Sequence, residues 1–211
     1  RRVDVRSGAD ARTLPDRLGW PFAMERLARL LPAPGVARLL ALGALVASLG
    51  FGAFNAGSAV FFTRSVGVPA SAVGLAFAAQ GVAGMLCAVP AGHLVDVIGP
   101  RRAVVIGGIV DAVLILALLS VHHVAPLVAL IAVIGAFNAF SDVGREALLA
   151  GLIAPDERVR TSAYLRSVLN AGITFGALGA GIAVAVDTRP AYASLIVWNA
   201  AMRLGTVAVT L

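Results

Sequence analysis

Six long apolar segments constrain the fold of this chain more than any other feature. They lie at about residues 39–62, 71–95, 103–121, 125–152, 162–186 and 191–211. Each is close to the roughly 20 residues that a helix needs to cross a hydrocarbon core of about 30 Å. Backbone groups in lipid must be satisfied internally, and the pattern lacks the alternating strands that a closed barrel needs. The sequence therefore predicts an all-α membrane protein with six transmembrane helices.

Composition supports a lipid environment and argues against several other classes. The chain has 59% hydrophobic and 13% charged residues, whereas soluble domains carry about 25% charged residues. All 17 basic residues are arginines; they lie beside apolar segments and are not grouped with aromatic residues, so we expect no nucleic-acid partner. Cys87 is the only cysteine, which excludes a disulfide framework and a cysteine metal cluster. The residue bias indicates a GC-rich genome, and we expect a bacterial source.

The loop arginines predict the domain layout and the orientation. Residues 1–37 form an arginine-rich tail and residues 38–211 a six-helix bundle; within the tail, a surface helix over 20–31 and a disordered segment fit the pattern equally well. The tail and the loops after spans two and four carry most loop arginines, whereas the opposite side has Arg64 and Arg189. The positive-inside rule then places the N-terminus and the 92–102 turn in the cytoplasm, and we expect the protein in the plasma membrane. Because the chain starts with arginine and stops inside an apolar run, we expect it to be truncated.

A short internal repeat links the first and fourth segments. Residues 52–60 read GAFNAGSAV and residues 135–143 read GAFNAFSDV, with seven of nine positions identical. The copies lie in the first and fourth spans, which are an odd number of spans apart, so they cross the bilayer in opposite directions. This arrangement is typical of an inverted three-plus-three repeat, although chance similarity in an Ala/Gly-rich chain is the alternative.

The turn between spans two and three carries a family resemblance. It reads Gly92-x-x-x-Asp96-x-x-Gly99-x-Arg101-Arg102 after Val-Pro-Ala, and it resembles the signature loop of the major facilitator superfamily. The resemblance covers residues 36–211 and implies the N-terminal six-helix half of a twelve-helix secondary transporter. The second half would come from the same full-length chain or from a dimer partner.

The resemblance also implies a role for this turn. In the family, the aspartate and the neighbouring arginines form cytoplasmic gate contacts that hold one conformation and break in the other. Gly92 would let helices approach closely, and Gly99 would make the sharp turn. One departure is Val97, where the family usually has a basic residue. The alternative is a solvated turn that only sets the topology.

Polar residues inside the spans are candidates for a proton or substrate path. Asp111 falls mid-span, where an ionised side chain costs about 3 kcal/mol on insertion scales. Asp142 and Arg145 are three residues apart on one helical face and can neutralise each other. Arg203 can pair with Asp111 or extend towards the cytoplasmic end. The candidate path residues are Asn55, Gln80, Asp111, Asn138, Asp142, Arg145, Glu146, Arg166 and Asn170.

The fifth segment carries closely spaced glycines. Gly172, Gly176, Gly179 and Gly181 form a run of small residues that favours close helix packing. The run also resembles the glycine-rich fifth-helix motif of the family's antiporters. That motif has a proline where this chain has Ala177, so a plain packing face is the alternative.

The sequence gives little support for an enzymatic function. Ser58 lies within a span, but a serine nucleophile needs a histidine base, and His93, His122 and His123 lie in or beside loops. The sequence contains no lysine and no GxxxxGK[ST] phosphate loop. We therefore expect no enzyme, no catalytic residue, no metal site and no cofactor.

The sequence as a whole predicts a secondary transporter that moves a small molecule by alternating access. The expected energy source is a proton gradient, with Asp111, Asp142 or Glu146 as the proton-binding carboxylate. The expected direction is efflux of a drug or metabolite. An uptake transporter of the same fold and a non-transporting, truncated membrane scaffold are the alternatives.

Overall fold

The computed structural model describes residues 36–155 and 157–211 of the chain. The predicted tail over residues 1–37 therefore lies almost entirely outside the described residues, as does Asp156.

Six helices in the described residues are long and apolar enough to cross a membrane. This confirms the predicted all-α class, and the observed spans extend the predicted ones by a few residues. The elements are α2 Val36–Val60 continued by the π-helical turn η2 Phe61–Ser65, α3 Ala70–Ile98, α4 Pro100–Ala117 with the 3-10 turn η3 Leu118–Ser120, α5 Val124–Leu152, α6 Arg158–Val186 and α7 Arg189–Thr210.

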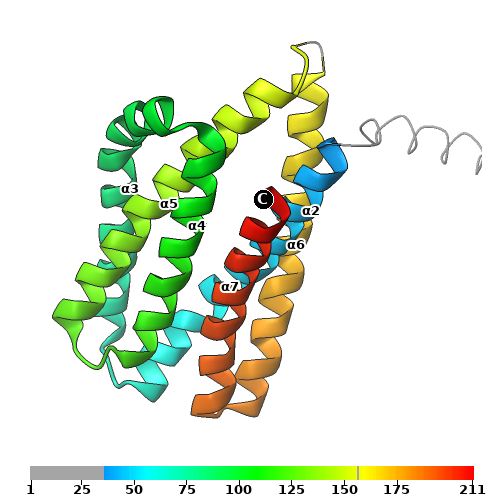
Figure 1. The fold of residues 1–211 in the computed structure, drawn as a ribbon. Coiled ribbons are helices and arrows are strands. Elements are labelled where there is room, and N and C mark those ends of the chain that lie inside the picture. Colours follow the sequence, from blue (N-terminus) through cyan, green and yellow to red (C-terminus); the bar gives the residue numbers. More distant parts are fainter. Residues whose placement is uncertain (1–35, 156) are drawn as a thin grey trace, which may run out of the picture.

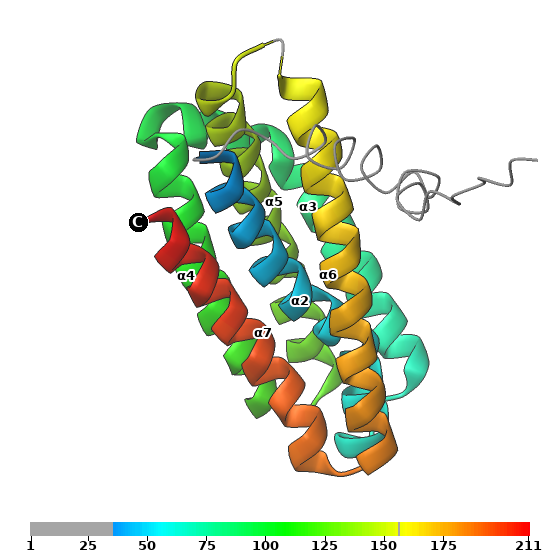
Figure 2. The same cartoon turned by 90° about the vertical axis from the view of Figure 1, so that its right-hand side faces the viewer.

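The helices form two groups of three (Figures 1 and 2). In one group α5 packs against α3 and α4, in the other α2 packs against α6 and α7, and α4 and α7 join the groups. Exchanging α2 with α5, α3 with α6 and α4 with α7 leaves this packing pattern unchanged. Each group therefore combines helices from both halves of the sequence, as expected for an inverted three-plus-three repeat.

The repeated motif lies where helices of the two three-helix repeats pack against each other. Gly52 of α2 lies against the backbone of α6, where an added Cβ would come within 2.2 Å of the Ile173 carbonyl oxygen. Gly135, its counterpart in α5, lies against α3, where an added Cβ would come within 2.2 Å of the Gln80 carbonyl oxygen. The glycine at the first position of each motif copy thus allows two helices from different repeats to cross in close contact.

The glycine run of α6 packs only along its first part. A Cβ on Gly172 or Gly176 would overlap atoms of Ser48 or Leu49 in α2. A Cβ on Gly179 or Gly181 would meet no atom within 4 Å in the described chain. The sequence predicts packing for all four glycines, but the structure places only the first two at a helix contact.

The turn between α3 and α4 is shorter than the sequence suggests. Residues 92–98 continue α3, and Gly99 alone separates it from α4, which restarts at Pro100. Gly99 has φ +89°, a left-handed conformation that L side chains rarely adopt, and its N–H donates to the Val95 carbonyl at 2.9 Å. Gly92, predicted to allow close helix approach, faces no atom within 4 Å of the described chain.

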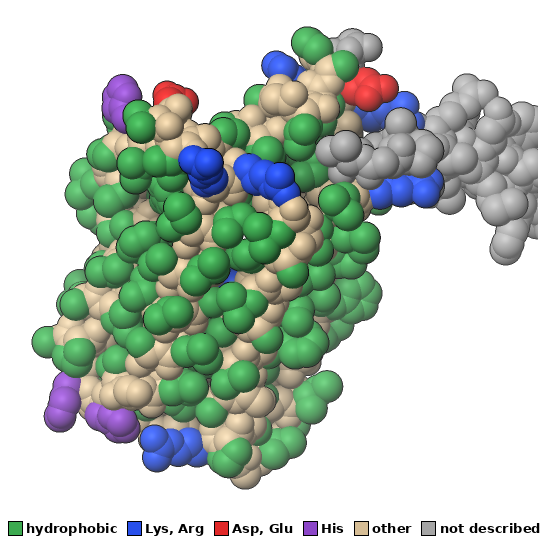
Figure 3. All heavy atoms as spheres, viewed as in Figure 1, with side chains coloured by type: hydrophobic (Ala, Val, Ile, Leu, Met, Phe, Trp, Pro, Cys, Tyr) green, Lys and Arg blue, Asp and Glu red, His purple; other side chains and the backbone are tan. Residues whose placement is uncertain are grey.

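The main core lies at the end of the bundle where α2 and α6 finish. It includes the large buried side chains of Phe61, Phe62, Ile131, Tyr192 and Ile196. On the face shown in Figure 3, hydrophobic side chains cover the middle of the molecule, and charged ones lie mainly near its two ends. A surface of this kind suits lipid along the sides and water at the ends.

Candidate transport cavity

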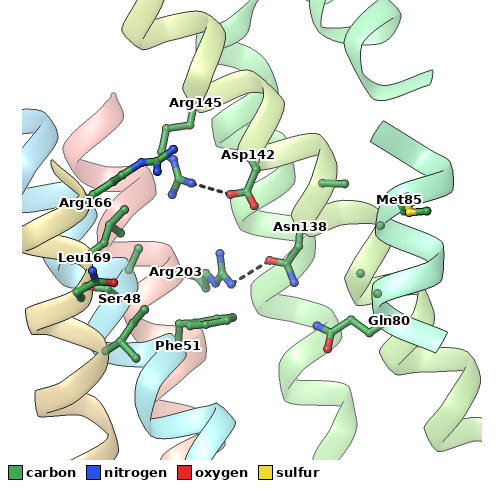
Figure 4. A pocket seen from close by; sticks show the side chains of 17 residues that line it. Ser48, Phe51, Gln80, Met85, Asn138, Asp142, Arg145, Arg166, Leu169 and Arg203 are labelled. Carbon is green, nitrogen blue, oxygen red and sulfur yellow. Dashed lines mark hydrogen bonds and ion pairs between the residues drawn. The ribbon is translucent and has the colours of Figure 1, made fainter. Parts of the chain in front are cut away.

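A cavity of about 590 Å³ lies between the two helix groups (Figure 4). Its volume is within the range of about 300–1,000 Å³ that is usual for small-molecule sites. The lining comes from five helices of both repeats and combines apolar and polar side chains: Ala47, Ser48, Phe51, Gln80, Gly81, Gly84, Met85, Gly135, Asn138, Ala139, Asp142, Arg145, Arg166, Leu169, Asn170, Ile173 and Arg203.

Six of the nine predicted path residues line this cavity. They are Gln80, Asn138, Asp142, Arg145, Arg166 and Asn170. The structure brings them together from α3, α5 and α6, although they are spread over about half of the sequence.

The other three path residues lie elsewhere. Asn55 is exposed and donates its amide N–H to the Phe51 carbonyl at 3.0 Å. Glu146 lines a smaller adjoining cavity of about 90 Å³ together with Arg145 and Arg166. Asp111 is buried behind the cavity wall, with 1% of its surface exposed.

A buried ion pair connects Asp111 to the cavity. Arg203 Nε lies 2.9 Å from Asp111 Oδ2, although the two groups lack the alignment of a hydrogen bond. Arg203 Nη2 donates to Asn138 Oδ1 at 2.9 Å. The Arg203 side chain, 15% exposed, thus links a carboxylate on α4 to an amide on α5. Of the two alternatives left by the sequence, the structure shows Arg203 paired with Asp111.

A second ion pair lies at the cavity surface. Arg145 Nη2 donates to Asp142 Oδ1 at 2.9 Å, the pairing that the three-residue spacing predicts. Arg166 lines the same cavity from α6 but forms no hydrogen bond or ion pair with any described residue. The cavity therefore has two paired arginines and one arginine without a protein partner among the described residues.

The charges at the α3–α4 turn do not pair with each other. Arg101 bonds across to the end of α7, donating Nε–H to the Thr210 carbonyl at 3.0 Å and Nη2–H to the Leu211 carbonyl. Asp96 is exposed, and its side chain makes no hydrogen bond or ion pair with the described residues. The family resemblance implies gate contacts for this carboxylate, but no described residue makes one with it.

Sequence reasoning did not place Arg203 in the cavity, nor Ser48 and Phe51. A signal for Arg203 was available, because a lone arginine inside an apolar span generally faces a bundle interior or a wet cavity. Ser48 and Phe51 carry no such signal, because a serine and a phenylalanine are ordinary residues of a transmembrane helix.

Comparison with known proteins agrees with this architecture. Residues 40–210 match the Major Facilitator Superfamily, which is most of the chain and all six spans. No curated protein matches the chain. The chain therefore belongs to the Major Facilitator Superfamily, whose members are multi-pass membrane transporters of small molecules and not enzymes.

Proposed function

We propose that this chain is the N-terminal six-helix half of a proton-coupled secondary transporter that exports a drug or metabolite by alternating access. The observation that carries the proposal is the charged cavity between the two helix groups. Placing an ionised side chain in a transmembrane helix costs about 3 kcal/mol on insertion scales. A scaffold that only needed packing and topology would gain nothing from lining a cavity with Asp142, Arg145, Arg166 and Arg203.

The exposure of the cavity wall supports a second six-helix half. Met85 and Phe51 line the cavity and are 77% and 38% exposed. The cavity therefore opens at the surface of these six helices. A second half, from the same full-length chain or from a dimer partner, would cover that opening, and rocking of the two halves would expose the cavity to each side in turn.

Asp111 is the carboxylate best suited to bind and release the coupling proton. It is buried inside the bundle and held by Arg203, which also reaches the cavity. A shift of Arg203 towards a substrate would leave Asp111 as an unpaired buried charge, and such a group tends to take up a proton. Asp142 and Glu146 are both exposed in the described chain, so neither would become an unpaired buried charge in this way.

The α3–α4 turn is the proposed cytoplasmic gate, formed by Gly92, Asp96, Gly99, Arg101 and Arg102. The exposed Asp96 carboxylate is available for a contact with the second half in one conformation. Asp96→Asn should then change the accessibility of cysteine probes placed in the cavity. Unchanged accessibility together with unchanged transport would reduce the turn to a topology anchor.

Transport by the full-length protein in liposomes tests the main proposal. Under an imposed pH gradient we expect substrate flux that depends on the gradient and is lost in Asp111→Asn. Glu157→Gln is the matched control, because Glu157 is an exposed carboxylate that lies outside the spans and does not line the cavity. Flux that survives Asp111→Asn would contradict the proton role of this residue. Absence of flux for every compound tried would favour the scaffold alternative.

A further inference from the structure

We propose that the cavity binds a small amphiphilic organic anion, with its carboxylate or equivalent oxyanion held by Arg166. This inference names a substrate class for the same cavity and so rests on the proposed transport function. The inference narrows the range of expected substrates, because a cationic drug would need unpaired carboxylates in the cavity and not an unpaired arginine.

The charge pattern of the cavity favours an anion. Of its three arginines, Arg145 is held by Asp142, and Arg203 by Asp111 and Asn138. Asp142 is the only carboxylate among the lining residues, and its partner is already in place. The charge of Asp142 is therefore already neutralised, and an incoming cation would meet no unneutralised carboxylate among the lining residues.

Arg166 lacks such a counter-charge within the described residues. Glu146 shares the adjoining small cavity with Arg166 and Arg145, yet in the described chain it forms an ion pair with neither of them. Arginines inside membrane proteins usually pair with an acid, a carbonyl or a ligand. A guanidinium group offers the planar fork of donors that binds carboxylates and phosphates in a bidentate manner. An incoming oxyanion would supply the missing partner.

The surroundings of Arg166 indicate the rest of the ligand. Asn170 follows one turn later on α6 and lines the same cavity, so it can donate a further hydrogen bond. Figure 4 shows Arg145 and Arg166 at one end of the cavity and Phe51 further along it. The apolar side chains of Phe51, Leu169 and Ile173 complete this wall. A ligand with an anionic head and an apolar body fits this polarity.

Three compounds with one skeleton and different charges test the proposal. The full-length protein in a non-ionic detergent is titrated with 4-phenylbutyrate, 4-phenylbutanamide and 4-phenylbutylamine, and binding is measured by calorimetry and by thermal stabilisation. We expect the carboxylate to bind at least about tenfold more tightly than the amide, the usual effect of a hydrogen bond between charged groups. We expect Arg166→Gln to remove that preference and Arg166→Lys to keep part of it.

Arg189→Gln serves as the matched control, because Arg189 is an exposed arginine at the far end of the bundle and does not line the cavity. Three results would each overturn the proposal. The amine could bind as tightly as the carboxylate, none of the three compounds could bind, or the preference for the carboxylate could be unchanged in Arg166→Gln. The binding measurement needs no membrane gradient. Anion binding without transport would thus contradict the proposed function alone, and transport without a preference for anions would contradict the inference alone.

Discussion

The Asp111–Arg203 pair places two opposite charges inside the membrane-spanning bundle. Removing one partner of a buried ion pair leaves the other uncompensated, which typically costs about 3–5 kcal/mol. We expect Asp111→Leu or Arg203→Met to destabilise the protein by about this amount, and the double variant to recover most of the loss because it removes both charges. Unfolding in detergent with increasing denaturant measures all three variants. Additive losses in the double variant would show that the two charges do not stabilise each other.

A second charged cluster lies at the far end of the bundle and should make stability depend on pH. Tyr192 Oη–H donates to Asp187 Oδ1 at 2.5 Å, and Arg64 Nη1 lies 3.0 Å from the same oxygen. The Tyr192 hydrogen bond first, and the Arg64 guanidinium second, hold the pKa of Asp187 below its usual value. Because the carboxylate is favoured in the folded state, its contribution is complete above the ordinary aspartate pKa of about 3.9 and is lost as the pH falls through the lower folded-state value.

Asp187→Asn tests this expectation, since asparagine tolerates the left-handed backbone (φ +49°) found at this residue. The wild-type protein should unfold at a higher temperature than the variant at pH 7, and the difference should shrink as the pH falls below about 4. Tyr192→Phe should weaken the same pH dependence by removing one hydrogen bond. A difference that stays constant down to pH 2 would contradict the cluster's role.

At the scale of helices, the two crossings of the repeat motif depend on glycine. A Cβ on Gly135 would come within 2.2 Å of a backbone oxygen of α3, which cannot move without moving the helix. Overpacking of this kind typically costs about 1–3 kcal/mol, so we expect Gly135→Ala to lower the unfolding temperature clearly. Gly179→Ala is the matched control, because this helical glycine faces open space. A Gly135→Ala protein as stable as the control would mean that α3 and α5 have room to separate.

The same elements show what could be predicted from the sequence. The spans follow from length and hydropathy alone, and the Asp142–Arg145 pair follows from helical spacing, because both depend on local geometry. The meeting of Asp111 with Arg203 depends on how α4 packs against α7, which no local pattern encodes. The repeat also does not extend to every side chain: Asn138 binds Arg203, whereas its counterpart Asn55 bonds within its own helix.

At the scale of the whole molecule, the two ends of the bundle differ in charge. The α3–α4 turn and the α5–α6 connection lie at the same end (Figure 1) and carry Arg101, Arg102 and Arg158. The opposite end carries Arg64 and Arg189. Loops rich in arginine remain in the cytoplasm during insertion, so the first end should face the cell interior.

Labelling of single cysteines in intact cells tests this orientation. In a Cys87→Ser background, His93→Cys places a thiol near the end of α3 and His122→Cys places one just before α5, and both positions are exposed. A membrane-impermeant maleimide added from outside should label the His122→Cys protein. It should reach the His93→Cys protein only after the cells are permeabilised, which also serves as the control for thiol reactivity. Labelling of His93→Cys in intact cells would show that the topology is the reverse of the expected one. The α3–α4 turn would then lie on the external side, which would exclude it as a cytoplasmic gate.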